Sequence, residues 1–528
     1  MRVYHLTKQL LRAPSRVSLR THRPELPEIS FRARTVAIGR DGPKEDPVSR
    51  TQQGVETPTP ASETHLKRNS LGFIGIAFFV VSAAAPMAAF VGASPVIFSI
   101  MGPGVPIVYV LVALVIAIFA IGYLKMSRHV VSAGGFVAYI ARGLGKHAAT
   151  GASGIVLVTY ISLQVGLWAQ FGVFAQQLMH RIFGLNLPVW VWCLGFLIIS
   201  TALTMRGVNL NLRVLGVLLI LEIIAITVFI GGVVAGSGGK DLSVVSFSPT
   251  QLVNPGLGVA VLFVFACFTT FEATTVFSEE ARQPRKTIPR ALFAVIIFVG
   301  VFYTLATWAV SVAVGPDKVQ AAAANNLSGI IFDVAAKYVG PWLDLTMQVL
   351  VVSSFIAMLI GVQNMFARYV YALGRARALP KQLDHVSKRS QVPARAALVN
   401  SIIIGVILMA FLWAGADPIV VVFSWFVALG TVGFIVMMGF ASVSILVFFL
   451  REKLERGFWT TRVAPAVSIV LMVTILVISI VNYDAMLSGD GTIARELLWF
   501  IPVFFAIGAV LPLLKKNVDF DKIVAAAS

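Results

Sequence analysis

The sequence predicts an all-α polytopic membrane protein with twelve transmembrane helices. Of its 528 residues, 58% are hydrophobic and only 12% are charged, whereas soluble domains carry about 25% charged residues. The apolar residues also gather into long runs, and a helix of ~20 apolar residues crosses the ~30 Å core of a bilayer. These runs are too long and too uniformly apolar for the alternating strands of a membrane barrel.

Twelve apolar runs follow one another from residue 71 almost to the C-terminus. They lie at 71–100, 104–124, 148–178, 187–205, 211–234, 255–279, 290–314, 341–373, 396–414, 418–448, 463–483 and 496–514. Together they predict a transmembrane domain over residues 70–515, with a short cytoplasmic tail at 516–528.

Residues 1–69 have a different composition. They contain 13 Lys and Arg, 7 Asp and Glu, and no run that could span a bilayer. This composition predicts a disordered basic tail in the cytosol. Its first 24 residues are basic without an acid and faintly resemble an organellar transit peptide. A start site assigned too far upstream is the alternative.

The positions of Lys and Arg predict the orientation. With the N-terminus in the cytosol, the inward loops and the C-terminal tail hold 23 Lys and Arg, and the outward loops hold five. Cytoplasmic loops of membrane proteins carry such an excess. We therefore expect both termini inside, in a multi-pass protein of the cell membrane, and a net charge of +18 that orients the chain rather than binding nucleic acid.

Two acidic residues lie inside apolar runs and away from the span ends, Glu222 in the fifth run and Glu272 in the sixth. A charge at the bilayer centre costs about 3 kcal/mol on insertion scales. A carboxyl group kept there usually carries a proton, has a partner or takes part in function. We predict proton coupling by both residues. The alternative is that each is a protonated strut that forms hydrogen bonds between helices.

Catalytic clusters are absent from the apolar runs. All seven histidines lie in the N-terminal tail, at span ends or in loops, and no His, Asp and Glu set has metal-ligand spacing inside a span. The cysteines, Cys193 and Cys267, form no disulfide framework. We expect neither an enzyme nor a metal or cofactor site. A receptor would be expected to carry a soluble domain, and residues 1–69 are too polar to form one.

Two of the runs carry signs of an interrupted helix. Pro86 follows Ser82, Ala83, Ala84 and Ala85 in the first run, so backbone groups near it lose their helical partners. The half-helix beyond would begin with free N–H groups that suit a carboxylate. The alternative is a simple proline kink. In the sixth run, poor helix formers precede Glu272, namely Cys267, Phe268, Thr269, Thr270 and Phe271. Paired interruptions five spans apart are typical of transporters with inverted repeats.

Three stretches resemble the amino acid–polyamine–organocation permeases. They are FEATTVFSEEARQPRKTIPRAL in and after the sixth run, SRHVVSAGGFVAYIARGLG after the second, and ARYVYALGRARALPKQLDHVSKRSQVPARA after the eighth. With SAAAP in the first run, the likeness covers roughly residues 70–515. The resemblance implies a five-plus-five inverted repeat with discontinuous helices 1 and 6, two extra C-terminal helices, and transport by alternating access.

The resemblance also implies site residues. The backbone of residues 82–85 would bind the substrate carboxylate, and carbonyls of residues 267–269 would take its amine. Phe268 or Phe271 would serve as an aromatic gate. Thr270 departs from the family, which usually has Gly there, so the pocket is narrower or gains a hydroxyl.

Polar residues of two other runs are candidates for selecting the substrate side chain. They are Gln164, Trp168, Gln363 and Asn364. Hydrogen bonding between helices is their alternative role.

We expect a secondary permease for amino acids or related small amines. A proton symporter is favoured, because Glu222 lies in the span where some proton-coupled relatives carry a Lys. Ser353 and Ser354 could instead bind sodium in a symporter. An exchanger of the same fold, an ion cotransporter or a channel are the remaining alternatives.

Overall fold

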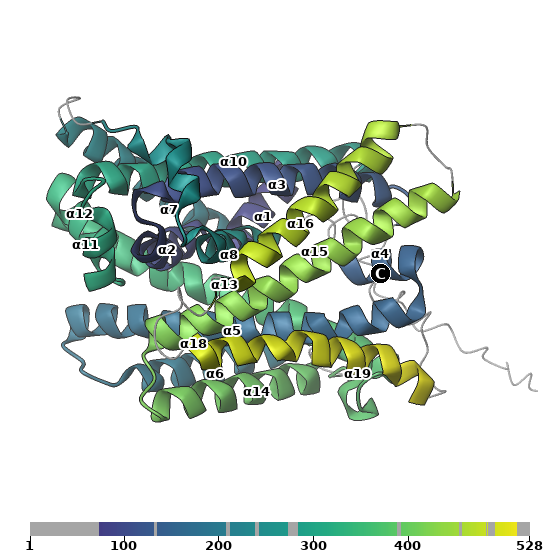
Figure 1. The fold of residues 1–528 in the computed structure, drawn as a ribbon. Helices are drawn as coiled ribbons and strands as arrows, with labels where there is room; N and C mark the ends of the chain where they lie inside the picture. Colours follow the sequence, from purple (N-terminus) through teal and green to yellow (C-terminus); the bar gives the residue numbers. More distant parts are fainter. Residues whose placement is uncertain are drawn as a thin grey trace, which may run out of the picture. The chain divides into compact units, whose positions relative to one another are not determined.

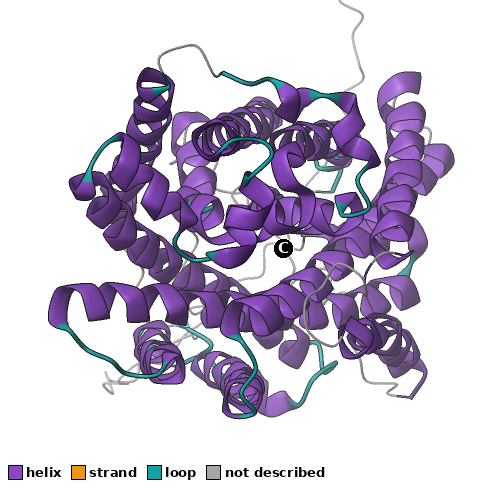
Figure 2. Ribbon diagram, turned by 60° about the vertical axis from the view of Figure 1, so that its left-hand side comes forward, coloured by secondary structure: helices purple, strands orange, loops and turns teal. Residues whose placement is uncertain are grey.

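Helices make up almost all of the described chain. A computed structural model of the protein describes residues 73–130, 135–206, 212–237, 242–272, 283–387, 392–452, 457–481, 483 and 491–514. All of them belong to one compact unit, His65–Ser528. The predicted tails lie outside the described residues. The described ranges contain no strand, and Figure 2 draws none, so the all-helical prediction is confirmed.

The longer helices run beside one another in a bundle (Figure 1). In that view α3 lies against α10, and α5 lies among α6, α15 and α19. The helices α15 and α16 run side by side and oblique to the others. Each of these pairs is in contact. The longer helices are α3 (Val105–Met126), α5 (Lys146–Phe183), α6 (Val189–Met205), α7 (Leu212–Gly236), α10 (Pro284–Val314), α13 (Pro341–Arg375), α14 (Ala394–Trp413), α15 (Ser424–Glu452), α16 (Ala464–Val481) and α19 (Phe500–Leu514).

Nine helical stretches in the described residues are long and apolar enough to cross a membrane. The first of them, Ala88–Met126, contains two α-helices, because α2 (Ser94–Met101) is followed by Gly102 with a φ of 62° before α3 begins. Three further apolar helices, of 10–17 residues, fall short of that length: α4 (Gly135–Leu144), α8 (Leu257–Phe268) and, although it belongs to the bundle described above, α6. Every predicted run overlaps one or more helices, and the protein is a multi-pass membrane protein.

Close contact between backbones holds α5 against its neighbours. A Cβ on Gly154 would run into the Phe504 carbonyl of α19, and a Cβ on Gly508 would run into the Thr150 carbonyl of α5. Lipid is as apolar as a leucine side chain, so membrane helices associate through close packing rather than through a hydrophobic effect. Small residues at these positions let the two helices approach.

Three short helices were not predicted. α4 lies in the segment that we expected to be an inward loop, and α11 (Val319–Asn325) and α12 (Ile330–Tyr338) lie in an expected outward loop. They are too short to be recognised by a criterion based on membrane thickness. α4 is nevertheless almost wholly buried, because it packs against α5 and α15.

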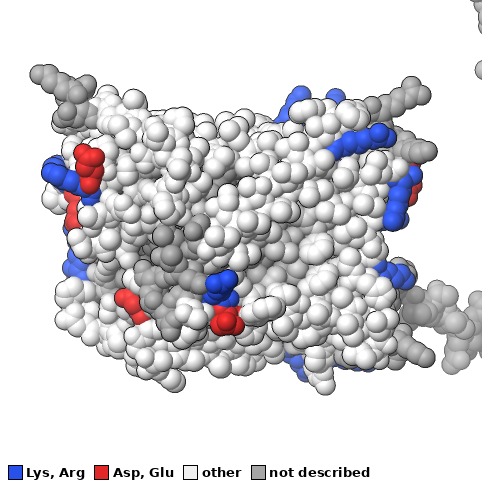
Figure 3. Space-filling view, in the orientation of Figure 1, with Lys and Arg blue, Asp and Glu red and all other residues white. Residues whose placement is uncertain are grey.

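Charged side chains lie mainly at the two ends of the helices on the face in Figure 3, apart from a blue and a red patch in the lower middle. A broad uncharged surface separates the two ends, as a bilayer requires. An ion pair joins two helix ends, where Arg181 of α5 lies 2.6 Å from Asp344 of α13.

Candidate functional site

The first apolar run is interrupted near its middle. α1 (Phe73–Ala83) ends before Pro86, and Ala85 has a positive φ of 48°. The chain continues as a π-helix, η1 (Ala88–Ala93), which leads into α2. Proline has no backbone N–H, and alanine tolerates a positive φ better than a bulky or branched residue does. The chain therefore leaves the helical path where the sequence predicts an interruption.

Glu222 of α7 lies at the start of the second half of this interrupted helix. Its Oε2 accepts a hydrogen bond from the Met87 N–H at 3.0 Å, and the residue is only 4% exposed. Ser354 Oγ of α13 accepts the N–H of Ala88 at 3.4 Å. The first turn of a helix presents N–H groups without intrahelical acceptors and the positive end of the dipole, so a carboxylate is favourable there.

The other donors at this break bond to neighbouring carbonyls. Ala84 N–H donates to the Val80 carbonyl at 3.0 Å, and Ala85 N–H donates to the Ser82 carbonyl at 3.1 Å. Ala84 and Ala85 are buried and Ser82 is half-buried, whereas only the backbone of Ala83 is described. The predicted segment therefore forms the break itself, with these two donors already paired.

The π-helix η1 is bound by a residue that the sequence analysis missed. Gln170 of α5 is buried, and its Nε2 donates to the Gly92 carbonyl at 2.8 Å. A π-helix shifts its carbonyls out of the usual helical pairing, so one of them accepts an outside donor. The signal in the sequence was an amide in the middle of the third apolar run.

The sixth apolar run changes conformation at its centre. α8 ends at Phe268, and a 3-10 turn, η5 (Thr269–Glu272), follows. Thr269 Oγ1 donates to the Ala266 carbonyl at 2.9 Å, so a hydroxyl occupies a carbonyl where the helix ends. The side chain of Thr270 and residues 273–282 lie outside the described part.

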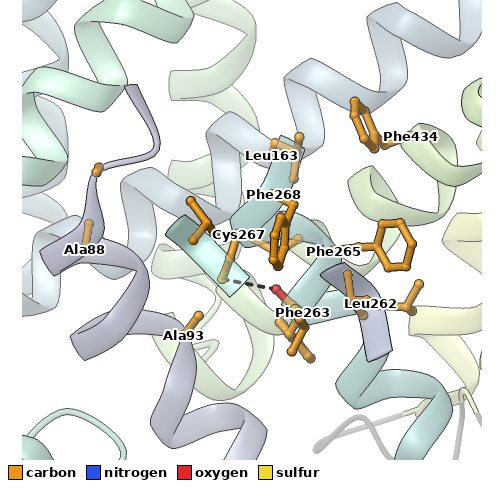
Figure 4. Packing of buried hydrophobic residues seen from close by; sticks show 14 of the residues in the cluster. Ala88, Ala93, Leu163, Leu262, Phe263, Phe265, Cys267, Phe268 and Phe434 are labelled. Atoms are coloured by element: carbon orange, nitrogen blue, oxygen red, sulfur yellow. Dashed lines mark hydrogen bonds between the residues drawn. The ribbon is translucent and has the colours of Figure 1, made fainter. Parts of the chain in front are cut away.

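Cys267 packs in the core beside the first break. Figure 4 shows its side chain near η1, which carries Ala88 and Ala93. Its Sγ donates to the Phe263 carbonyl at 3.4 Å, drawn as a dashed line, and lies 3.6 Å from the Tyr109 hydroxyl. Contacts join α8 to η1 and α1 to η5. The two interrupted regions are therefore neighbours in space.

Glu272 binds the beginning of α4. Its Oε1 accepts the Phe136 N–H at 3.5 Å, and its Oε2 accepts the hydroxyl of Tyr160 in α5 at 3.2 Å. Gly135 has a φ of 51°, and a Cβ there would run into the Glu272 carboxyl group. Both facts require glycine. Each of the two acids predicted inside the membrane therefore accepts a backbone N–H from the start of a helix.

Phe271 lies within an aromatic cluster. Its ring centroid is 6.0 Å from those of Phe119 and Phe434 and 6.4 Å from those of Tyr123 and Phe136, all in edge contacts. These rings come from α3, α4 and α15. Both aromatic residues suggested as a gate are buried, with Phe268 and Phe271 at 3% and 1% exposure.

Gln363 of α13 joins three helices. Its Oε1 accepts from Ser200 Oγ at 2.7 Å, and its Nε2 donates to Thr201 Oγ1 at 3.0 Å and to Ser401 Oγ at 2.5 Å. The partners belong to α6 and α14. Every polar atom of this amide is thus used in hydrogen bonds between helices, which is the alternative role stated for it.

Gln164 has a similar environment. Its Oε1 accepts from Asn400 Nδ2 of α14 at 3.1 Å, and its Nε2 donates to the Tyr160 carbonyl at 3.1 Å. Trp168 is 1% exposed, and its Nε1 has no hydrogen-bond partner in the described residues. Asn364 is half-buried on α13.

Ser353 and Ser354 differ in the direction of their hydroxyls. Ser353 Oγ donates to the Leu350 carbonyl of its own helix at 3.0 Å, whereas Ser354 faces the first break. Only one of the two predicted sodium ligands therefore lies against the interrupted helix.

A pocket of about 260 Å³ lies elsewhere, between α5, the turn that joins α11 to α12, and the π-helix η8 (Pro418–Phe423). None of the predicted site residues lines it. Asp417 at its rim accepts the N–H groups of Ile419 and Val420 and so begins η8.

Comparison with known proteins finds permeases and importers of amino acids and amines. The chain is 26% identical to the branched-chain amino acid permease BcaP of Lactococcus lactis subsp. cremoris, over 59% of this chain and 69% of that protein. It is 25% identical to the low-affinity putrescine importer PlaP of Escherichia coli, over 66% of this chain and 74% of that protein. MhsT, solved with L-phenylalanine, shares the fold with a TM-score of 0.56 at 14% identity, covering 79% of this chain and all of MhsT.

The family assignment follows from a match over most of the membrane domain. The family model described as "Amino acid permease" matches residues 75–517, which include both interrupted helices as well as Glu222 and Glu272. This family consists of transporters and not of enzymes. The chain belongs to the amino acid permease family.

Proposed function

We propose that this permease is a secondary active transporter that moves amino acids or related small amines across the cell membrane by alternating access, driven by protons. The observation that carries the proposal is the pair of interrupted helices. They contact each other, and an acid lies at each one: the buried Glu222 at the first and the half-buried Glu272 at the second. Helix interruptions at the bilayer midplane are where such transporters bind solutes and coupling ions.

The proposed architecture is twelve spans with a five-plus-five inverted repeat and two extra C-terminal helices. In this count α1, η1 and α2 form the first span, and α8 and η5 begin the sixth. The excess of Lys and Arg in the inward loops supports a cytosolic location of both termini. The likeness of fold to MhsT supports the architecture as well.

The substrate range follows from what the relatives share. BcaP is named for branched-chain amino acids and PlaP for putrescine, and all of these solutes carry an amine. We propose that carbonyls of residues 267–269 take this amine, that the backbone of residues 82–85 lines the opposite side, and that Phe268 or Phe271 closes over the solute. Selectivity for the rest of the molecule is assigned to Thr270 and to three side chains of the third and eighth spans: Gln164, Trp168 and Asn364.

Protons are favoured over sodium as the coupling ion for two reasons. Glu222 and Glu272, which lie inside apolar runs, carry carboxyl groups that can bind and release a proton. The hydroxyl of Ser353 bonds back to its own helix, and the oxygen of Ser354 faces the Ala88 N–H. An oxygen turned toward a donor is poorly placed to coordinate a cation.

Purified protein in liposomes tests the coupling. We expect uptake of amino acids or amines to rise when the outside is acidified and to persist when choline replaces sodium. In Glu272→Gln we expect proton-driven uptake to fall at least about tenfold while the protein stays folded, because the amide cannot release a proton. Normal pH-dependent uptake by this variant would refute the role of Glu272, and collapse of uptake in choline would establish sodium coupling.

Glu222 is tested by its pH profile. In Glu222→Gln the amide oxygen still accepts the Met87 N–H, so the break keeps its partner while the titrating group is lost. We expect the dependence of uptake on external pH to shift or disappear. An unchanged profile would leave Glu222 with a purely structural role.

A further inference from the structure

The backbone N–H groups around the first break indicate which class of substrate the protein can bind. Pro86 has no N–H, and each other backbone N–H from Ala84 to Ala89 has an acceptor within the protein. The N–H groups of Ala84, Ala85 and Ala89 donate to carbonyls of α1 or of the break, and the remaining two have side-chain acceptors. These side-chain acceptors, Glu222 and Ser354, belong to distant helices and bind the first turn beyond Pro86.

Glu222 and Ser354 occupy the place where a helix start would bind a substrate carboxylate. Such a site uses the exposed N–H groups of the first turn together with the positive end of the dipole. Here those N–H groups belong to Met87 and Ala88, and both are taken. The two acceptors are 4% and 2% exposed, so they form a buried unit.

Protonation of Glu222 does not free the Met87 N–H for a substrate carboxylate. A protonated carboxyl group keeps a carbonyl oxygen that accepts the Met87 N–H, so the donor stays occupied in both states. When Glu222 is ionised, a second carboxylate at the same helix start would also be repelled. Two carboxylates that share a site disfavour each other's charged form.

The charged residues of the interrupted helices also favour a substrate without a carboxylate. Residues 73–101 and 257–272 contain no Lys, Arg or His. A carboxylate bound between them would have no cationic side chain from either segment. An ammonium group would find carboxyl groups, because Glu222 lies at the first break and Glu272 lies in η5. A buried charge needs such a partner in a medium of low dielectric constant.

We propose that the solute carried by this protein is an aliphatic or aromatic amine or a diamine without a carboxylate, and that Glu222 fills the position a substrate carboxylate would take. This inference rests on the permease function proposed above and narrows its substrate class. Of the two named relatives, PlaP, named for putrescine, represents the chemistry expected here, and BcaP represents the chemistry excluded.

Matched pairs of compounds test the proposal, because each pair differs only by the carboxylate. The pairs are L-leucine with 3-methylbutylamine, L-phenylalanine with 2-phenylethylamine, and L-ornithine with putrescine. Binding to the purified full-length protein is measured by thermal shift and isothermal titration, and transport by competition with labelled putrescine in liposomes. We expect at least one amine to bind at least about tenfold more tightly than its parent, a difference of ~1.4 kcal/mol.

Glu222→Ala supplies a second test, since it frees the Met87 N–H and removes the negative charge. We expect the preference for the amine over its parent to shrink at least about tenfold in this variant. Glu452→Gln, an exposed acid at the end of α15, is the matched control and should keep the wild-type preference. If Glu222→Ala does not fold, Ser354→Ala frees the neighbouring Ala88 N–H and should shift the preference in the same direction.

The outcomes separate this inference from the function on which it rests. If an amino acid is bound and transported better than its matched amine, the permease function stands and the inference is overturned. A preference that Glu222→Ala leaves unchanged also overturns it, because the selectivity then lies elsewhere. If neither series is bound or transported by the wild-type protein, the proposed function fails together with the inference.

Discussion

Replacing Gln363 by methionine tests whether this amide is a structural strut or a substrate ligand. The substitution removes three hydrogen bonds to hydroxyls of α6 and α14, and methionine is flexible enough to fill the space. Hydrogen bonds between membrane helices contribute roughly 0.6 kcal/mol each on average. We therefore expect the free energy of unfolding to fall by about 2 kcal/mol.

The released hydroxyls keep this cost from growing. The single proton of the Ser200 hydroxyl can turn to the Leu197 carbonyl, which lies within hydrogen-bonding distance, while Thr201 donates to the same carbonyl and Ser401 donates to the Ala397 carbonyl. None of the three is left without a partner, so the desolvation penalty of about 1–3 kcal/mol for an unpaired buried group does not apply.

The assay combines unfolding in mixed detergent micelles with uptake kinetics in liposomes. For Gln363→Met we expect reduced stability, with KM unchanged within about twofold, because a strut does not touch the solute. Gln176→Met is the control, since it removes one hydrogen bond, to the Leu187 carbonyl, at an exposed position. A tenfold rise in KM with unchanged stability would refute the structural reading and make Gln363 a ligand.

Two further substitutions test the helix starts and the π-helix. Gly135→Ala places a side chain at a positive φ, which costs about 1–2 kcal/mol, and its methyl group displaces the Glu272 carboxyl group. We expect this variant to lose uptake while its abundance in the membrane stays normal. Full uptake would show that the contact between Gly135 and Glu272 is dispensable. Gln170→Met leaves the Gly92 carbonyl without its amide donor. We therefore expect the free energy of unfolding, measured in the same mixed micelles, to fall by about 1–3 kcal/mol. An unchanged free energy would mean that the carbonyl finds another donor.

Hydropathy predicted the helices because membrane thickness imposes a minimum apolar length on every span. The run at 341–373 became Pro341–Arg375, and the run at 211–234 became Leu212–Gly236. The interruption near Pro86 was equally predictable, since the missing N–H is a property of the residue itself. These features depend on composition or on one residue, and neither requires knowledge of the fold.

The sequence did not predict which residues form hydrogen bonds across the bundle. Met87 and Glu222 are 135 positions apart, and Phe136 and Glu272 are 136 apart. Hydropathy places a buried acid at a depth but does not say which helix start it meets. The helix α4 was missed for a related reason, because its burial comes from packing against α5 and α15 rather than from length.

The contact between Glu222 and the first break explains how an interrupted helix is stable in a bilayer and how it can move. Backbone N–H groups at a break have no water to bond in the hydrocarbon region, and Glu222 supplies the missing acceptor to Met87 from α7. A motion that separates α7 from η1 removes this acceptor and leaves the carboxyl group without its donor at the same moment. Both groups then need new partners, and a carboxyl group accepts an ammonium ion or a proton. We therefore expect the hydrogen bond that stabilises the break to be also the point at which binding of solute or proton is coupled to helix movement.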